Sequence, residues 1–260
     1  MVGRDVLVSR GEARQIGEPV LEVRNVAGPG LAEPVSLTIR AGEIVGIFGL
    51  IGAGRTELLK AIYMGDEGEV LLNGQPVPRK GPRRSVEGGL VFCPEDRKKE
   101  GIVPMLSVAE NLNLSIRRRL AQAGIWVAYG KERENTDRFI DKLRIKTPTH
   151  GTPISNLSGG NQQKVILARW LSEKVQAILL DEPTRGIDVG AKAEIYDIAR
   201  SLAAQGIAVV FVSSELPEIL ALSDRVVVMS EGRVTGDMPC SEATEEKLLS
   251  LALPKPVVYA

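Results

Sequence analysis

Short hydrophobic runs alternate with amphipathic stretches along most of the chain. Four of these runs are too short for helices and are typical of buried strands. They are Glu43–Leu50, Ala177–Leu180, Ile207–Val212 and Val226–Met229. Apolar residues at helical spacing predict helices over Thr56–Tyr63, Gln162–Ser172, Ala191–Ala204 and Pro217–Leu222. Strands that alternate with helices in this way predict a parallel sheet covered on both faces.

The amino-terminal part carries a different pattern. Val20–Val26 alternates weakly and predicts an edge strand, and Val35–Ile39 predicts a second strand. Asn73-Gly74 is a strong turn signal, and it predicts a hairpin of Glu69–Leu72 with Gln75–Val77. Residues 1–18 are polar and have no clear period, so we expect a linker there.

The middle of the chain, from about Glu95 to Leu157, is charged and its strands give way to helical patterns. Phe139, Ile140 and Leu143 share one face of a predicted helix. An inserted group of helices is therefore expected between two parts of the sheet.

Composition narrows the classes of protein. Lys+Arg and Asp+Glu both number 33, so the strongly basic surface typical of nucleic-acid binding is absent. The two cysteines, Cys93 and Cys240, predict buried thiols rather than a disulfide scaffold. The longest apolar run, Ile207–Val212, is far short of the roughly 20 residues of a membrane span. The first residues carry no apolar segment typical of a secretory signal.

A glycine-rich segment, Gly49–Thr56, has the spacing of a phosphate-binding loop between a predicted strand and helix. Glycines let backbone N–H groups surround phosphate oxygens, and the helix N-terminus adds positive charge. Arg55 stands where that motif has lysine, and its planar fork is not equivalent to a compact ammonium. On this motif alone, a purely structural glycine turn remains the alternative.

The apolar strand at Ala177–Leu180 ends in two acids. Asp181 could hold Mg²⁺ through water, and Glu182 could polarise an attacking water. Two adjacent acids alone more often cap a helix. After a phosphate loop in an alternating sheet, they favour a nucleotide hydrolase.

A second candidate anion site precedes the helix at Gln162. Ser158, Gly159 and Gly160 would present a hydroxyl and free N–H groups at that helix N-terminus. An ordinary N-cap with a glycine loop is the alternative.

Taken together, these segments resemble the nucleotide-binding domain of ABC transporters, over about residues 19–253. Leu157-Ser158-Gly159-Gly160 looks like the ABC signature, in order with the phosphate loop and Asp-Glu-Pro-Thr. Three segments are similar to the second of two fused ATPase domains in bacterial monosaccharide importers. They are Gly52–Leu58, Cys93–Lys98 and Asp181–Gly190.

The resemblance implies an α/β fold: a P-loop ATPase core with a parallel sheet, an amino-terminal antiparallel β subdomain and an inserted helical subdomain. The ATPase domain would cover residues 19–260, with the insert at about 96–161, after a linker at 1–18 that joins the two halves. In that family two such domains sandwich two ATP molecules. Each site takes its phosphate loop and acids from one domain and the signature from the other.

The resemblance also assigns roles to single residues. The phosphate-loop positions are Gly49, Gly52, Ala53, Gly54, Arg55, Thr56 and Glu57. The implied Mg²⁺ positions are Thr56, Asp181 and Glu95, and the implied catalytic positions are Glu182, Ser214 and Glu95. The signature that would reach the partner's ATP is Leu157, Ser158, Gly159, Gly160 and Asn161. Asp188 falls in the loop that touches the opposite site.

Three residues depart from the family pattern: Arg55 replaces lysine, Glu95 replaces glutamine and Ser214 replaces histidine. Glu95 places an extra negative charge near the γ-phosphate, which Mg²⁺ would have to offset. The signature is largely intact. The expected asymmetry is that this domain binds ATP but hydrolyses it slowly or not at all, while its signature completes a site on the amino-terminal half. The retained Glu182 argues the other way.

The function implied is the ATP-binding subunit of an importer for L-arabinose or a similar pentose, at the cytoplasmic face of the inner membrane. Its partners would be the amino-terminal ATPase half or a second copy, membrane permease subunits and, indirectly, a periplasmic sugar-binding protein, but no nucleic acid. The alternatives are a soluble ABC protein acting on ribosomes, a half without chemistry, and a nucleoside importer ATPase.

Overall fold

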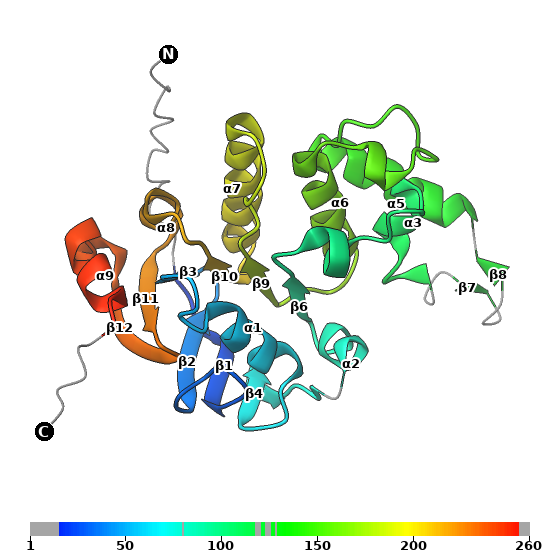
Figure 1. The fold of residues 1–260 in the computed structure, drawn as a ribbon. Coiled ribbons are helices and arrows are strands. Elements are labelled where there is room, and N and C mark those ends of the chain that lie inside the picture. The colour runs from blue at the N-terminus through cyan, green and yellow to red at the C-terminus, as the bar shows by residue number, and fades with distance from the viewer. Residues whose placement is uncertain (1–15, 80, 118–120, 123–125, 128, 255–260) are drawn as a thin grey trace, which may run out of the picture.

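The computed structural model describes residues 16–79, 81–117, 121–122, 126–127 and 129–254. Within these ranges a large central sheet packs against a smaller one, and a group of helices forms a lobe to one side (Figure 1). The predicted linker at 1–18 lies outside the described residues except for residues 16–18.

The larger sheet has, within the described residues, six strands in the order β12-β11-β3-β10-β9-β6. The strands are β3 (Ile44–Gly49), β6 (Leu90–Cys93), β9 (Ala177–Asp181), β10 (Ala208–Val212), β11 (Arg225–Ser230) and β12 (Arg233–Pro239). Neighbours are parallel except β11 and β12, which are antiparallel. The predicted parallel sheet is confirmed, and β6 and β12 are additions that the hydrophobic pattern did not reveal.

The strands of this sheet are hydrophobic because both faces are covered. Side chains alternate between faces, so on β10 Phe211 and Val210 belong to different cores. The core containing Phe211 is shared with α6 (Gly159–Leu171), α7 (Val189–Ala204), α8 (Leu216–Leu222) and α9 (Glu245–Ala252). The core containing Val210 is shared with α1 (Arg55–Met64) and the smaller sheet. Cys93 and Cys240 are both buried thiols, as predicted.

The smaller sheet is antiparallel, in the order β2-β1-β4-β5. Its strands are β1 (Pro19–Val26), β2 (Val35–Arg40), β4 (Glu69–Leu72) and β5 (Gln75–Pro76). Asn73 and Gly74 both have positive φ, at 48° and 72°, which confirms the predicted hairpin turn. The prediction that Val20–Val26 is an edge strand was wrong, because the hairpin folds back and β4 pairs with the side that β2 leaves free.

The helical lobe lies between β6 and β9 in the chain, and α2 (Pro82–Glu87) precedes β6. The lobe contains η1 (Arg97–Gly101), α3 (Val108–Asn113), β7 (Ala121–Gln122), β8 (Trp126–Val127), α5 (Tyr129–Leu143) and η2 (Ile154–Asn156). The helices α3 and α5 of the lobe pack against α6. The short helix η3 (Cys240–Glu242) is not part of the lobe; it follows β12 in the chain. The predicted helical character is confirmed, with the short β7–β8 pair as an addition.

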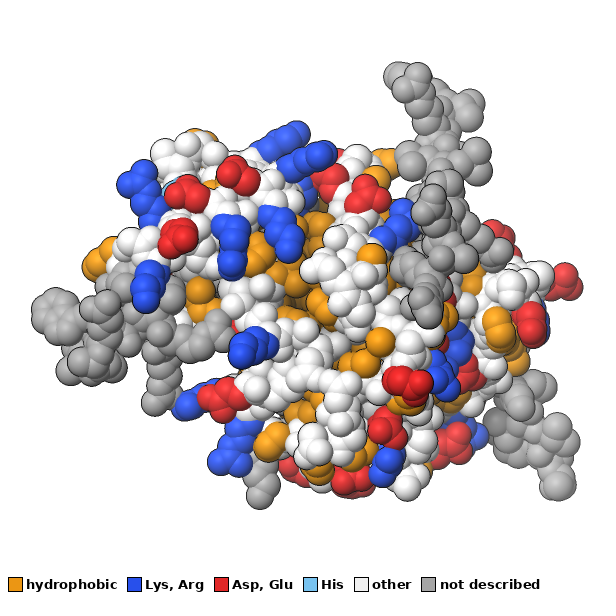
Figure 2. All heavy atoms as spheres, turned by 180° about the vertical axis from the view of Figure 1, so that it is seen from behind, with side chains coloured by type: hydrophobic (Ala, Val, Ile, Leu, Met, Phe, Trp, Pro, Cys, Tyr) orange, Lys and Arg blue, Asp and Glu red, His pale blue; other side chains and the backbone are white. Residues whose placement is uncertain are grey.

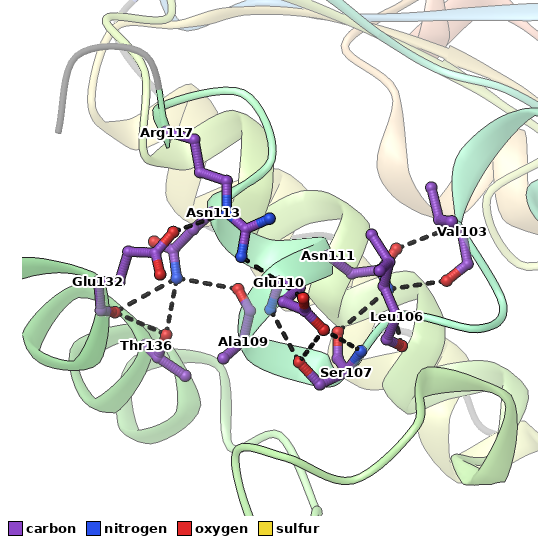
Figure 3. A network of polar contacts seen from close by, with 10 residues as sticks. All are labelled: Val103, Leu106, Ser107, Ala109, Glu110, Asn111, Asn113, Arg117, Glu132 and Thr136. Carbon is purple, nitrogen blue, oxygen red and sulfur yellow. Dashed lines mark hydrogen bonds and ion pairs between the residues drawn. The ribbon is translucent and has the colours of Figure 1, made fainter. Parts of the chain in front are cut away.

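Buried Asn111 fixes the loop that leads into α3 (Figure 3). Its side chain accepts a hydrogen bond from the Val103 N–H at 2.8 Å and donates to the carbonyls of Val103, Leu106 and Ser107. Ser107 and Glu110 close a capping box at the start of the helix. The loop is therefore anchored from within while Met105 stays 89% exposed.

Seen from behind, the surface is hollowed, with hydrophobic side chains in the hollow and lysine and arginine side chains around it (Figure 2). A groove of about 310 Å³ lies among α5, α6 and α7. None of the helices in the described ranges combines the length and the hydrophobicity that spanning a bilayer requires.

Candidate functional site

The loop between β3 and α1 has the geometry of a phosphate cradle. Strand β3 ends at Gly49, and α1 begins at Arg55 with Gly54 as its N-cap at φ 93°. Gly52 has φ 81°, and a Cβ added there would meet no atom within 4 Å. A side chain at Gly52 would therefore project into open space where a phosphate is expected, and glycine leaves that space free. The seven predicted residues lie together here: Gly49, Gly52, Ala53, Gly54, Arg55, Thr56 and Glu57.

A pocket of about 390 Å³ opens beside this loop. Residues 51–57 line it together with Glu95, Glu182, Arg185, Ser214 and Glu215. The structure thus brings Glu95, Glu182 and Ser214, which come from distant parts of the sequence, to the phosphate loop.

Asp181 is the last residue of β9 and is fully buried. Neither carboxylate oxygen makes a hydrogen bond to any described residue, although the Thr56 hydroxyl is near enough to lower the pKa somewhat. Burial dominates and raises the pKa of Asp181 from 3.8 to about 6. A buried carboxylate with free oxygens beside a threonine hydroxyl is a donor set that fits Mg²⁺.

Glu182 is held at the pocket by Arg55. The guanidinium Nη1 lies 2.9 Å from Glu182 Oε1, and both side chains are largely buried, at 11% and 8% exposure. The Ser214 hydroxyl donates to Glu182 Oε2 at 3.3 Å. Burial raises the pKa of Glu182, and Arg55 opposes that shift. The backbone of Glu182 has φ 43°, a conformation that costs on the order of 1–3 kcal/mol. The contacts of its side chain with Arg55 and Ser214 help to maintain this conformation.

Glu95 forms an ion pair with Arg185 at the rim of the pocket. The extra negative charge at this position, which the sequence suggested Mg²⁺ would have to offset, therefore has a protein cation beside it. Arg97, two residues after Glu95 in the charged run Arg97-Lys98-Lys99, is half-buried and contacts the loop at Arg185.

The signature residues lie apart from this pocket, and none of the five lines it. Leu157 is buried, whereas Ser158 is exposed at the N-cap of α6. The Ser158 hydroxyl makes no capping hydrogen bond to a backbone N–H of α6. Instead Asn161 Nδ2 donates to Ser158 Oγ at 2.9 Å, and Asn161 Oδ1 accepts from the Lys146 N–H. Gly159 and Gly160 follow as the first residues of the helix, and Asp188 is the N-cap of α7.

Sequence reasoning missed Glu218, which binds side chains from the loop after β9 and from the loop after β10. Its buried carboxylate accepts hydrogen bonds from Thr184 and Ser213, each at 2.7 Å, and from Tyr196 at 2.6 Å. Lys192 donates to it at 2.9 Å. No motif marks this residue, because its donors come from separate elements.

Comparisons with known proteins place these features in a family. Residues 32–185 match the family described as "ABC transporter". The chain is 51% identical to the arabinose import ATP-binding protein AraG of Shigella boydii over 98% of this chain and 51% of that protein. It is 52% identical to AraG 2 of Burkholderia cenocepacia over 98% of this chain and 50% of that protein. The chain thus spans about half the length of these curated relatives.

Solved structures share the fold. A nucleotide-free ATP-binding cassette from an ABC transporter superposes with a TM-score of 0.73 at 21% identity, covering 91% of this chain and 100% of that one. A cassette in a dimeric post-hydrolysis state with ADP and phosphate gives 0.71 at 22% identity, covering 85% and 98%. The family match and the identity to these relatives show that the chain belongs to the ABC transporter family, and its fold is that of an ABC ATPase domain.

Proposed function

We propose that this chain is the second ATPase half of an ABC importer that couples ATP binding and hydrolysis to uptake of a monosaccharide, L-arabinose or a similar pentose. The observation that carries the proposal is 51% identity, over 98% of the chain, to half of an arabinose import ATP-binding protein. The similarity of Cys93–Lys98 and Asp181–Gly190 to the second domain of fused importer ATPases supports the assignment to that half.

The pocket fits ATP with Mg²⁺. The phosphate loop would hold the phosphates through backbone N–H groups and the Arg55 side chain. Asp181 and Thr56 would hold Mg²⁺, since the oxygens of Asp181 are free of hydrogen bonds from described residues. When bound, Mg²⁺ supplies positive charge that stabilises the phosphoryl group during transfer. Glu182 would accept a proton from an attacking water, and the Ser214 hydroxyl, which donates to that carboxylate, would orient it.

The ion pair between Arg55 and Glu182 supports slow hydrolysis at this domain's own site. Burial raises the pKa of Glu182, but the guanidinium at 2.9 Å makes the carboxylate a weaker base than burial alone would, because the cation stabilises the charged form. Arg55 would have to leave Glu182 for the phosphates before Glu182 could accept a proton. The need for this extra step is the reason why we propose slow hydrolysis at this site.

The signature supports a role at the site of the amino-terminal half or of a second copy. Ser158 is exposed and oriented by Asn161 at the N-terminus of α6. Hydroxyl and backbone donors fixed in this way suit a phosphate brought by a partner.

The remaining partners follow from the same proposal. Permease subunits in the inner membrane would dock near Glu95–Met105, where Val103 and Met105 are 40% and 89% exposed on an anchored loop. A periplasmic sugar-binding protein would act through those subunits. The chain would thus lie at the cytoplasmic face of the membrane as a peripheral subunit.

ATP binding and hydrolysis by the purified chain, alone and mixed with the matching amino-terminal half, test the proposal. We expect Mg²⁺-dependent ATP binding, little hydrolysis alone, and increased turnover in the mixture. Rapid hydrolysis by the chain alone would overturn the degenerate site. Binding without any effect on the other half would indicate a half without chemistry.

A further inference from the structure

Three segments meet at the guanidinium of Arg97, which has no role so far. Arg97 begins η1, at the point where the chain leaves β6 for the helical lobe. Its Nη1 donates to the Arg185 carbonyl at 2.7 Å, and Nη2 donates to the Gly186 carbonyl at 3.2 Å. The loop at Arg185–Asp188 begins three residues after Glu182.

The same guanidinium packs against the signature. A Cβ added to Gly159 would lie 2.5 Å from Arg97 Nη2 and 3.1 Å from the Gly186 carbonyl oxygen. Gly159 is therefore in contact with both the arginine and the loop that the arginine holds. Any larger residue there would push them apart.

A second link joins the same two chain segments. Glu95, two residues before Arg97, pairs with Arg185, whose carbonyl Arg97 also binds. Glu95 and Arg185 line the nucleotide pocket, and both also line a neighbouring pocket of about 280 Å³ with Arg97. Residues 95–97 and 185–186 thus form a two-point junction between the nucleotide pocket and the signature.

We propose that Arg97 is a positioning residue that sets the spacing between the signature and the loop at Arg185–Asp188. These are the two elements that would face the partner's ATP, so this inference rests on the proposed function. Burial lowers the pKa of Arg97, but the guanidinium keeps its charge and its forked geometry binds both carbonyls at once. Lysine could donate to one carbonyl but could not span the pair as a rigid fork.

The test uses Arg97→Ala and Arg97→Lys, with Lys98→Ala as the matched control from the same turn. Lys98 is exposed and carries the same charge. In the chain paired with its amino-terminal half, Arg97→Ala should lower kcat about 100-fold with KM changed less than threefold, since misplacement of about 1 Å costs that much. Arg97→Lys should lose less, and added guanidinium ion should restore part of the activity of Arg97→Ala. Lys98→Ala should match the wild type, because the paired halves in this assay include no permease subunit.

Two further measurements separate positioning from a general loss of structure. Binding of a fluorescent ATP analogue to the variant chain alone should stay within twofold, because the phosphate loop is untouched. Hydrogen exchange at residues 158–161 and 185–188 of the chain alone should speed up about tenfold in Arg97→Ala and not in Lys98→Ala. Unchanged exchange there, or turnover equal to that of Lys98→Ala, overturns the inference, and so does a matching loss of nucleotide binding.

The exchange measurement needs no partner, so it also separates this inference from the proposed function. If wild-type halves fail to stimulate each other while exchange responds as expected, then the proposed function fails and the junction stands. If the halves stimulate each other and exchange does not respond, then the junction fails alone.

Discussion

The nucleotide pocket and the signature surface are built in opposite ways. In the pocket, charged side chains neutralise one another: Arg55 holds Glu182, and Arg185 holds Glu95. At the signature, the polar groups are fixed by neighbours yet remain exposed, with Ser158 oriented by Asn161. The difference teaches where the two surfaces would need to change: Glu182 would have to lose its ion pair before it could act as a base, whereas Ser158 is already exposed to a partner.

The largest effect should come from blocking the signature. Ser158→Arg places a bulky side chain where the partner's phosphate is expected, so turnover of the paired halves should fall at least 10²–10³-fold, as when an aimed donor is lost. ATP binding by this chain's own pocket should not change, because Ser158 does not line it. Steady-state hydrolysis and equilibrium binding measure the two quantities.

Ser155→Arg is the matched control for that experiment. Ser155 is exposed in the short turn just before the signature, so the same charge and bulk are added nearby. Equal losses from both variants would mean that added bulk anywhere on this surface blocks pairing, and the special role of Ser158 would be lost.

The second effect is a gain of function in the pocket. Arg55→Lys, Glu95→Gln and Ser214→His together restore the family pattern at the three positions that depart from it. We expect hydrolysis at this domain's own site to rise about 10–100-fold, because Glu182 is freed and a titrating donor is added. Activity is measured in paired halves whose other site is disabled. The same triple variant with Glu182→Gln should show no gain, and a gain there would contradict the role of Glu182 as base.

The third effect concerns the free energy of unfolding, which the buried carboxylate of Asp181 lowers when no cation is bound. Because burial raises the folded-state pKa of Asp181 to about 6, folding takes up a proton between pH 4 and 6, and this group makes the fold less stable as pH rises through that window. Asp181→Asn should therefore raise the unfolding free energy at pH 7.5 by about 1–2 kcal/mol while removing Mg²⁺-dependent nucleotide binding. Denaturant titration at pH 4.5 and 7.5 measures the first quantity.

Glu182→Gln is the control for that measurement. It removes the adjacent carboxylate but breaks the buried ion pair with Arg55, so it should destabilise the fold at pH 7.5. If Asp181→Asn destabilises the fold as well, then the buried carboxylate of Asp181 does not lower the free energy of unfolding at pH 7.5.

Local patterns predicted the parts of this site that depend on local geometry. Glycine spacing and a preceding apolar run predicted a loop between a strand and a helix at Gly49–Thr56, and the apolar run before the paired acids predicted the strand that ends at Asp181. The pairing of Arg55 with Glu182 joins residues 127 positions apart, and no periodicity encodes it. Arg97 was hidden in a charged run, because its partners are backbone carbonyls that have no sequence signal.

The distinction between local pattern and long-range pairing also explains the errors in the predicted fold. Strand β6 is a four-residue run behind two glycines, and β12 contains Gly236 and Asp237, which are unusual in strands. The position of β1 inside its sheet depends on where a later hairpin folds. Pairing partners are chosen by tertiary structure, whereas the alternation of side chains is a property of the strand itself.

The smallest effect should come from Arg55→Ala, and it is the most direct test of the contrast between the two surfaces. If the domain's own site contributes little turnover, then removing its phosphate-loop cation should lower hydrolysis by the paired halves less than threefold, even if ATP binding to this pocket weakens about tenfold. The variant also frees Glu182 from its ion pair, which offsets part of the loss of charge at the phosphates. Hydrolysis by the pair and nucleotide binding by the chain alone should therefore separate, with binding the more sensitive. A loss of turnover as large as that caused by Ser158→Arg would mean that both sites must fire together, and the asymmetry would be wrong even though every contact described here remained.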